Sequence, residues 1–136
     1  MYLTLIKNSD ESKIVLYKIA RIIYAETNAS SLRAAEALAS MISNLRAKSK
    51  RRLIDIADDR SVFESLDRNS SRHEKLLVGI DSNGFQMCLR VARRMIGGGL
   101  SDECWGATKF HRAEFLPDWA VARGYIAEID GLYFYL

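Results

Sequence analysis

The 136-residue sequence is poor in several residue types that define well-known protein classes. One proline and eight glycines exclude a collagen-like or linker-like chain. The two cysteines, Cys88 and Cys104, are too few for a disulfide framework, and their spacing does not fit a zinc site. The apolar stretches are only a few residues long, which excludes a transmembrane helix. We expect a single domain, residues 1–136, that folds on a hydrophobic core.

Signals for cofactors and export are also missing. The glycine run at 97–99 is not followed by the Lys-Ser/Thr of a phosphate loop, and neither histidine has further ligands at helical spacing, so we expect no cofactor and no metal. The chain starts without the apolar segment of a secretory signal, so no export route is visible. The net charge of +3 suits nucleic acid, acidic lipid or bacterial wall polymer without selecting among them.

The first pattern along the sequence is helical periodicity. A first helix should begin near residues 10–12 and end around Glu26, with Ile14, Tyr17, Ala20 and Tyr24 at spacings of three and four. Ser30 or Ser31 can cap a second helix, whose apolar face is alanine-rich. A short helix or turn is predicted at 53–57, and a longer helix from about 82 to 96 ends at the glycine run.

The C-terminal third changes to strand patterns. Residues 125–129 and 132–135 read as two strands, and Asp130-Gly131 between them favours a two-residue hairpin. The segment 108–111 is short and compatible with an extended conformation. The sum is an α+β fold class: a mostly helical single domain with a small antiparallel β-hairpin.

Glu26 is the acid with the most informative position. It follows Ile22-Ile23-Tyr24-Ala25 at the C-terminal end of an apolar helix. Poor solvation and the negative end of the helix dipole both favour a carboxylic acid that keeps its proton. Cleavage of a glycosidic bond needs such a proton donor. A solvated helix-end residue is the structural alternative.

A glycosidase commonly uses a second carboxylate, and here none is singled out by the sequence. Glu64, beside Phe63, is the best placed by its neighbours, but its distance from Glu26 is not fixed by the pattern. A reaction that uses one acid stays open. The other candidates are Glu36, Asp58, Asp59 and Asp67.

Aromatic residues gather towards the C-terminus. Strand alternation puts Tyr133 and Tyr135 on one face and Phe134 on the other, so one set is core and the other is free to line a groove for sugar rings. His111 either positions a substrate or is structural, and His73 should be exposed. The basic run 46–52 is expected to be solvated, with phosphate binding as the alternative.

Three ordered motifs resemble a known family. Ala20 to Glu26 with the alanine-rich helix after it, then Gly106 to His111 with Pro117-Asp118-Trp119, then Ile129 to Tyr135, resemble the cell wall hydrolase family of the spore cortex-lytic enzyme type. The resemblance implies a lysozyme-like fold and cleavage of peptidoglycan between N-acetylmuramic acid and N-acetylglucosamine. It implies a lytic transglycosylase with Glu26 as acid and base, giving 1,6-anhydro products.

The resemblance and the patterns together define the expected site. Glu26 is the catalytic residue, Trp119 is structural, and the chain is a monomer that binds peptidoglycan glycan strands, not nucleic acid, at the cell wall or periplasm. A hydrolytic muramidase that uses Glu64, and a catalytically inactive wall-binding module, are the alternatives. The expected substrate-binding residues are Tyr24, Glu64, Thr108, Phe110, His111, Tyr133 and Tyr135.

Overall fold

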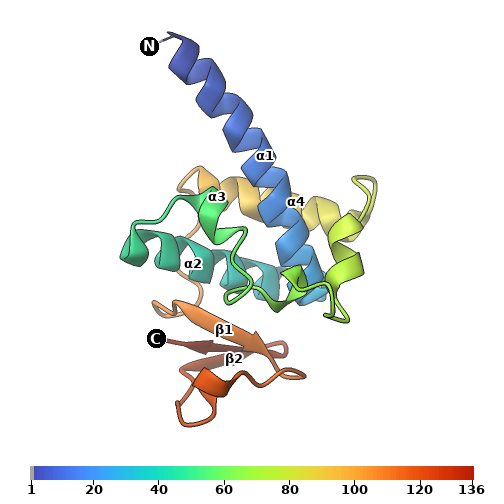
Figure 1. Ribbon diagram of the computed structural model, residues 1–136, viewed down its shortest axis with the longest axis vertical. Helices are drawn as coiled ribbons and strands as arrows, with labels where there is room; N and C mark the ends of the chain where they lie inside the picture. Colours follow the sequence, from blue (N-terminus) through green and yellow to red (C-terminus); the bar gives the residue numbers. More distant parts are fainter. Residues whose placement is uncertain (1) are drawn as a thin grey trace.

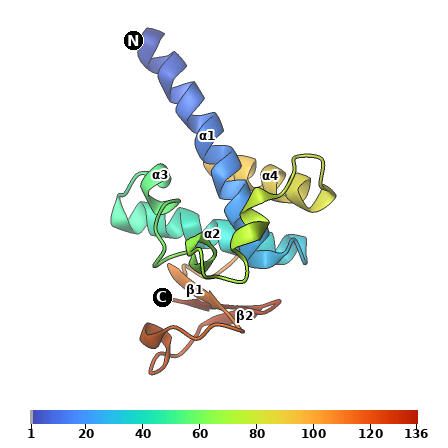
Figure 2. The same ribbon diagram turned by 45° about the vertical axis from the view of Figure 1, so that its right-hand side comes forward.

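The longest helix is α1, which covers Tyr2–Thr27 in a computed structural model that describes residues 2–136 (Figure 1). It begins earlier than the prediction near 10–12, because residues 2–9 contain no proline or glycine to stop a helix. Its N-terminal turns extend beyond the rest of the molecule in both ribbon views (Figures 1 and 2). Its end at Thr27 agrees with the prediction around Glu26.

One stripe of α1 is buried and carries the acid. Val15, Ile19, Ile22 and Glu26 recur at spacings of four, three and four, so they share one face of the helix. Ile14, predicted on the apolar face, is exposed. The helix packs against α4, so the burial of this stripe fixes the position of Glu26.

Helix α2, Leu32–Ser49, lies at the centre of the fold. The hydroxyl of Ser31 accepts the N–H of Ala34 at 3.0 Å, which confirms the predicted cap. The helix is buried almost continuously from Ala34 to Ile42, and its alanines let α4 and β1 approach closely. The same Ser31 hydroxyl donates to Asp130 and so ties the helix start to the hairpin turn.

The remaining helices follow the predicted pattern. The short helix α3 is Leu53–Ile56, and α4 is Asn83–Ile96 with Ser82 as its cap. Helix α4 ends at the predicted glycine run. Over the described part of the chain, no helix combines the length and the apolarity needed to cross a bilayer. Three 3-10 turns lie in the connections: η1 (Glu64–Leu66), η2 (His73–Leu77) and η3 (Asp118–Ala120).

The sheet contains the two strands of the predicted hairpin and a third strand. Strand β3 (Leu132–Tyr135) pairs antiparallel with both β1 (Lys109–Arg112) and β2 (Ala127–Ile129). Asp130 and Gly131 have φ values of 49° and 89°, which confirms the two-residue turn. Strand β2 begins at Ala127 rather than at residue 125, and the extended 108–111 segment becomes β1, shifted by one residue.

The described residues form one small α+β domain, about half helical, with the sheet on one side of the helices (Figures 1 and 2). Phe110 of β1 lies between Phe63 and Phe134, with ring centroids 6.1 and 6.3 Å away. These fully or nearly fully buried rings join the helices, the 60–67 loop and the sheet in one core. The loop and β1 are thereby held on either side of the end of α1.

Candidate functional site

Glu26 is the buried acid at the end of α1. Its exposed fraction is 1%, and it is the largest fully buried acidic side chain among the described residues. One carboxylate oxygen accepts the backbone N–H of Ser65 at 2.9 Å, and the other accepts from the guanidinium of Arg112. The burial expected from the sequence is present, but the surroundings are not purely apolar, because the carboxylate contacts a buried guanidinium and a backbone N–H.

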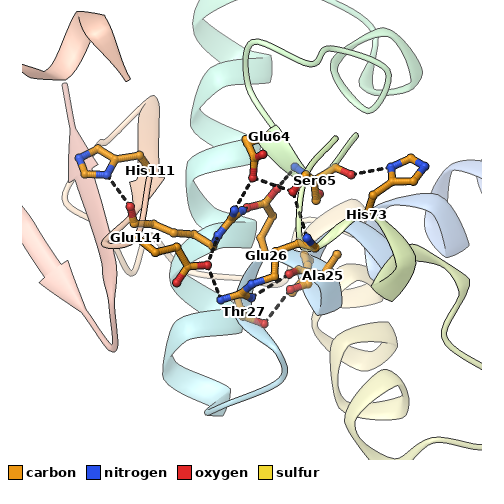
Figure 3. A network of polar contacts seen from close by, with 12 residues as sticks. Ala25, Glu26, Thr27, Glu64, Ser65, His73, His111 and Glu114 are labelled. Atoms are coloured by element: carbon orange, nitrogen blue, oxygen red, sulfur yellow. Dashed lines mark hydrogen bonds and ion pairs between the residues drawn. The ribbon is translucent and has the colours of Figure 1, made fainter. Parts of the chain in front are cut away.

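Arg112 connects three carboxylates. It lies at the end of β1 and is 4% exposed, and its Nη1, Nη2 and Nε donate to Glu26, Glu64 and Glu114 respectively. The three acids converge in Figure 3. Burial alone lowers the pKa of Arg112, but the charge of Glu26 and the hydrogen bonds to all three acids raise it above its ordinary value. The guanidinium is therefore a fixed positive charge beside Glu26.

A second arginine closes the network on the solvent side. Arg72 forms an ion pair with Glu114 at 2.7 Å and donates to the carbonyl of Ala25 at 3.0 Å, so it also binds the end of α1. Glu64 accepts the Ser70 hydroxyl at 2.8 Å and keeps about a quarter of its side chain exposed. Three carboxylates and two guanidiniums thus meet where helix, loop and sheet come together.

The loop that carries Glu64 is itself anchored. Phe63 is fully buried, and the Ser65 carbonyl lies 2.9 Å from Nδ1 of His73, which is half-buried rather than exposed as predicted. The Ser65 hydroxyl is buried with no hydrogen-bond partner among the described residues. This anchoring holds the Ser65 N–H on the Glu26 carboxylate.

Beside this network lies a hollow of about 260 Å³, which we call the acid hollow. Glu26 and Glu64 lie on it together with Phe110 and His111, so four of the residues expected at the site share one cavity. The acid hollow is lined by Glu26, Arg60, Ser61, Val62, Glu64, Asp67, Phe110, His111, Arg112, Phe115, Pro117 and Trp119.

A second hollow of about 470 Å³ adjoins the first, and we call it the lysine hollow. The two share a partition of Ser61, Val62, Phe110 and Trp119. Along β1 and the residue before it, residues 110–112 line the acid hollow and residues 108–110 line the lysine hollow, so the hollows follow one another along the strand. The lysine hollow is lined by Leu45, Lys48, Ser49, Ser61, Val62, Thr108, Lys109, Phe110 and Trp119.

The predicted tyrosines take other places. Tyr133 stacks on His111 with centroids 5.4 Å apart, and the Tyr135 hydroxyl lies 2.8 Å from His111 Nε2. Neither tyrosine is among the lining residues of the two hollows. Both contact His111, and Tyr135 also contacts the ring of Trp119. Tyr24 also lines neither hollow and lies beside Gly84 of α4. These three residues are better placed to support the site than to touch a ligand.

Arg112 and the position of Trp119 were missed from the sequence. Strand alternation places Arg112 on the same face of β1 as the core residue Phe110. A charged residue on a core-facing position requires a buried partner of opposite charge, but that rule does not say which acid is the partner. Trp119 was assigned a structural role, whereas it forms part of the partition between the hollows.

The arrangement places a buried carboxyl group and a fixed cation beside a cavity with aromatic walls. Among the residues whose side chains are described, no cluster of three or more His, Cys, Asp or Glu is arranged to hold a metal ion. The chain matches no known family model, no curated protein and no solved structure.

Proposed function

We propose that this chain is a peptidoglycan lytic transglycosylase of lysozyme-like fold, acting at the bacterial cell wall or periplasm, with Glu26 as its acid and base. One observation carries the proposal. Glu26 is almost fully buried and yet lies on a cavity with aromatic walls from Phe110 and Trp119. Burying an acid is unfavourable for the fold, so a buried acid that still contacts a cavity points to a chemical role.

The reaction needs only one carboxyl group. Glu26 donates its proton to the glycosidic oxygen, and the bond from that oxygen to C1 of the muramic acid breaks. The Glu26 carboxylate then takes the proton of the muramic 6-hydroxyl, whose oxygen forms the new bond to C1. The products are a free 4-hydroxyl on one strand and a 1,6-anhydro ring on the other, and Glu26 ends protonated for the next cycle.

Arg112 and Ser65 support the charged stage of this cycle. After proton donation Glu26 is an anion, and the guanidinium of Arg112 and the N–H of Ser65 already lie on its two oxygens. Donors fixed before the reaction stabilise the anion without reorganisation during it. The walls formed by Phe110 and Trp119 offer flat apolar faces of the kind on which sugar rings pack.

A hydrolytic muramidase is the second candidate, because Arg112 brings Glu64 to the same guanidinium as Glu26. Glu64 is the more exposed of the two acids and lines the same hollow, where a water molecule has access to it. In that reaction Glu64 activates water, and the product carries a reducing end one water heavier than the anhydro product. The buried ion pair also suits the other alternative, an inactive module in which Glu26 has only a structural role.

Digestion of purified sacculi followed by mass spectrometry distinguishes the transglycosylase, the muramidase and the inactive module. The wild-type chain should release 1,6-anhydro muropeptides, and Glu26→Gln should lower the rate by about 10²- to 10⁴-fold, the usual contribution of a general acid–base group. Gln keeps the size of Glu and an oxygen for a donor, and Arg112 keeps Glu64 and Glu114 as partners, so this is the mildest change that removes the acid. Glu64→Gln should leave the anhydro product unchanged.

The control is Glu74→Gln, which removes an exposed acid that lines neither hollow. It should cleave at the wild-type rate. Thermal unfolding of all three variants shows whether a loss of rate reflects a loss of fold. If Glu26→Gln cleaves at the wild-type rate, the proposal is wrong. If the products carry reducing ends and their release depends on Glu64, the chain is a hydrolytic muramidase instead.

A further inference from the structure

The lysine hollow is set apart from the other cationic surface by its place beside the acid hollow, and its two cations have no anionic partner among the described residues. Lys48 and Lys109 line it, and no acidic residue is among its lining residues. Several other surface cations are paired, for example Arg94 with Glu36 and Arg51 with Asp59. Among the described residues, neither Lys48 nor Lys109 lies within ion-pair distance of a carboxylate.

The polar groups around the two lysines are already committed as donors. The Ser49 hydroxyl donates to the Leu45 carbonyl at 2.7 Å, the Ser61 hydroxyl to Asp59 at 2.6 Å, and the Thr108 hydroxyl to the Leu136 carbonyl at 3.2 Å. The side-chain donors of the lining residues that remain for a ligand are therefore the two ammonium groups and the indole N–H of Trp119.

The Lys109 ammonium is also held in place. It lies 5.5 Å from the centre of the Trp119 ring, a distance at which an aromatic face attracts a cation. Trp119 belongs to the partition, so this positive charge is located at the border between the two hollows. A ligand that enters the acid hollow and continues along β1 meets it next.

We propose that the lysine hollow binds a carboxylate of the peptide stem carried by the muramic acid whose bond is cleaved in the acid hollow. This inference rests on the proposed function for its substrate. The N-acetylated glycan backbone is neutral, and the anionic groups of the repeating unit are the carboxylates of the stem. Two unpaired ammonium groups beside the acid hollow match that distribution of charge.

The stem is long enough for this contact. The hollows are offset by two residues of β1, about 7 Å at the usual strand rise of about 3.3 Å per residue. An extended peptide spans about 3.3–3.6 Å per residue, so two or three residues of a stem cover the offset. The lysine hollow, about 470 Å³, is large enough for several residues of peptide.

Binding can be measured without cleavage. A GlcNAc–MurNAc disaccharide with a tetrapeptide stem contains no MurNAc–GlcNAc bond to cut, so its affinity for the wild-type chain can be measured by calorimetry. The comparison ligands are the same compound with amidated carboxylates, the disaccharide without a stem, and a short glycerol phosphate oligomer. The variant is Lys48→Gln/Lys109→Gln. The matched control is Lys13→Gln/Lys75→Gln, which removes the same charge from residues that line neither hollow.

Amidation should weaken binding by about three- to tenfold, and the Lys48/Lys109 variant should bind both forms equally weakly, because two exposed charge pairs contribute about that much. The control variant should keep the preference for the free carboxylate. Added salt should reduce the preference.

Three results would overturn the inference: equal affinity for free and amidated stems, an equal loss in the control variant, or lysine-dependent binding of the glycerol phosphate oligomer in place of the stem. Digestion of sacculi tests the proposed function and is measured independently of ligand binding. Lysine-dependent binding of the stem by a wild-type chain that cleaves nothing would remove the proposed function and leave the carboxylate site in place.

Discussion

The two hollows along β1 differ in how their charges are held. In the acid hollow the charges are buried and paired: Arg112 is 4% exposed and Glu26 is 1% exposed, with a hydrogen bond or ion pair on each carboxylate oxygen. In the lysine hollow the charges of Lys48 and Lys109 are exposed and without a carboxylate partner among the described residues. Both hollows share the same strand and the same aromatic partition.

This difference matches two tasks that the proposed polymer-cleaving site has to combine. A proton-transfer group must be held rigidly, because its effect depends on position, and buried partners supply that rigidity. A group that only attracts a charged branch needs reach and free donors, which exposed lysines supply at little cost to the fold. Stability should therefore depend strongly on the charges of the acid hollow and weakly on those of the lysine hollow.

Arg112→Ala is the strongest test of that contrast. The change leaves Glu26 buried beside a gap, and breaking a buried ion pair costs about 3–5 kcal/mol of unfolding free energy. Lys48→Gln/Lys109→Gln should stay within about 0.5 kcal/mol of wild type. Urea unfolding measures both.

The control for Arg112 removes both members of the pair. Glu26→Gln/Arg112→Met leaves neither buried charge of the pair, so it should recover part of the loss seen in Arg112→Ala. The contrast fails if Arg112→Ala and the lysine variant unfold at similar free energies, or if the double change is no better than Arg112→Ala alone.

How far this site could be predicted depends on the range of the interactions that form it. The cap at Ser31 and the turn at Asp130-Gly131 were predictable, because each follows from neighbours within a few residues. Glu26 was found as a candidate because the apolar residues before it are local too. Its place on the stripe of Ile19 and Ile22 explains its burial.

The rest depended on contacts between distant parts of the chain. Arg112 is 86 residues from Glu26, and nothing in the local pattern says which acid it meets. Tyr133 and Tyr135 were placed on one strand face correctly, but that face packs on His111 and Trp119 instead of lining a hollow. The start of α1 at Tyr2 differs from the prediction because potential caps near residue 10 do not end a helix that has no breaker before them.

Trp119→Ala tests what the two hollows share. Since Trp119 lies in the partition, its removal should weaken binding of the disaccharide with or without a stem by about tenfold, as for a central aromatic contact. The lysine variant should affect only the ligand with a stem. Calorimetry with both ligands separates the two effects.

The other tryptophan gives the matched control. Trp105 is 67% exposed and lines neither hollow, so Trp105→Ala should bind both ligands as wild type does. The variant Trp105→Phe leaves Trp119 as the single tryptophan of the sequence. Its fluorescence should change on titration with the disaccharide. Equal affinities in Trp119→Ala and Trp105→Ala would show that the partition takes no part in binding.

The effect that is smallest at neutral pH concerns two buried thiols, Cys88 and Cys104. Burial raises the pKa of Cys88 to about 12, and burial with the charge of Asp102 raises the pKa of Cys104 to about 12, against an ordinary value of 9.0. Between about pH 9 and 12 the unfolded chain loses these protons while the folded chain keeps them, so their contribution favours unfolding as the pH rises. Urea unfolding from pH 8 to 11 should therefore show a steeper loss of stability in wild type than in Cys88→Ala/Cys104→Ala, which removes both thiols and keeps the other titrating groups. Parallel curves would mean that the thiols are open to solvent, and native alkylation with iodoacetamide, expected to be slow at both, would then be fast.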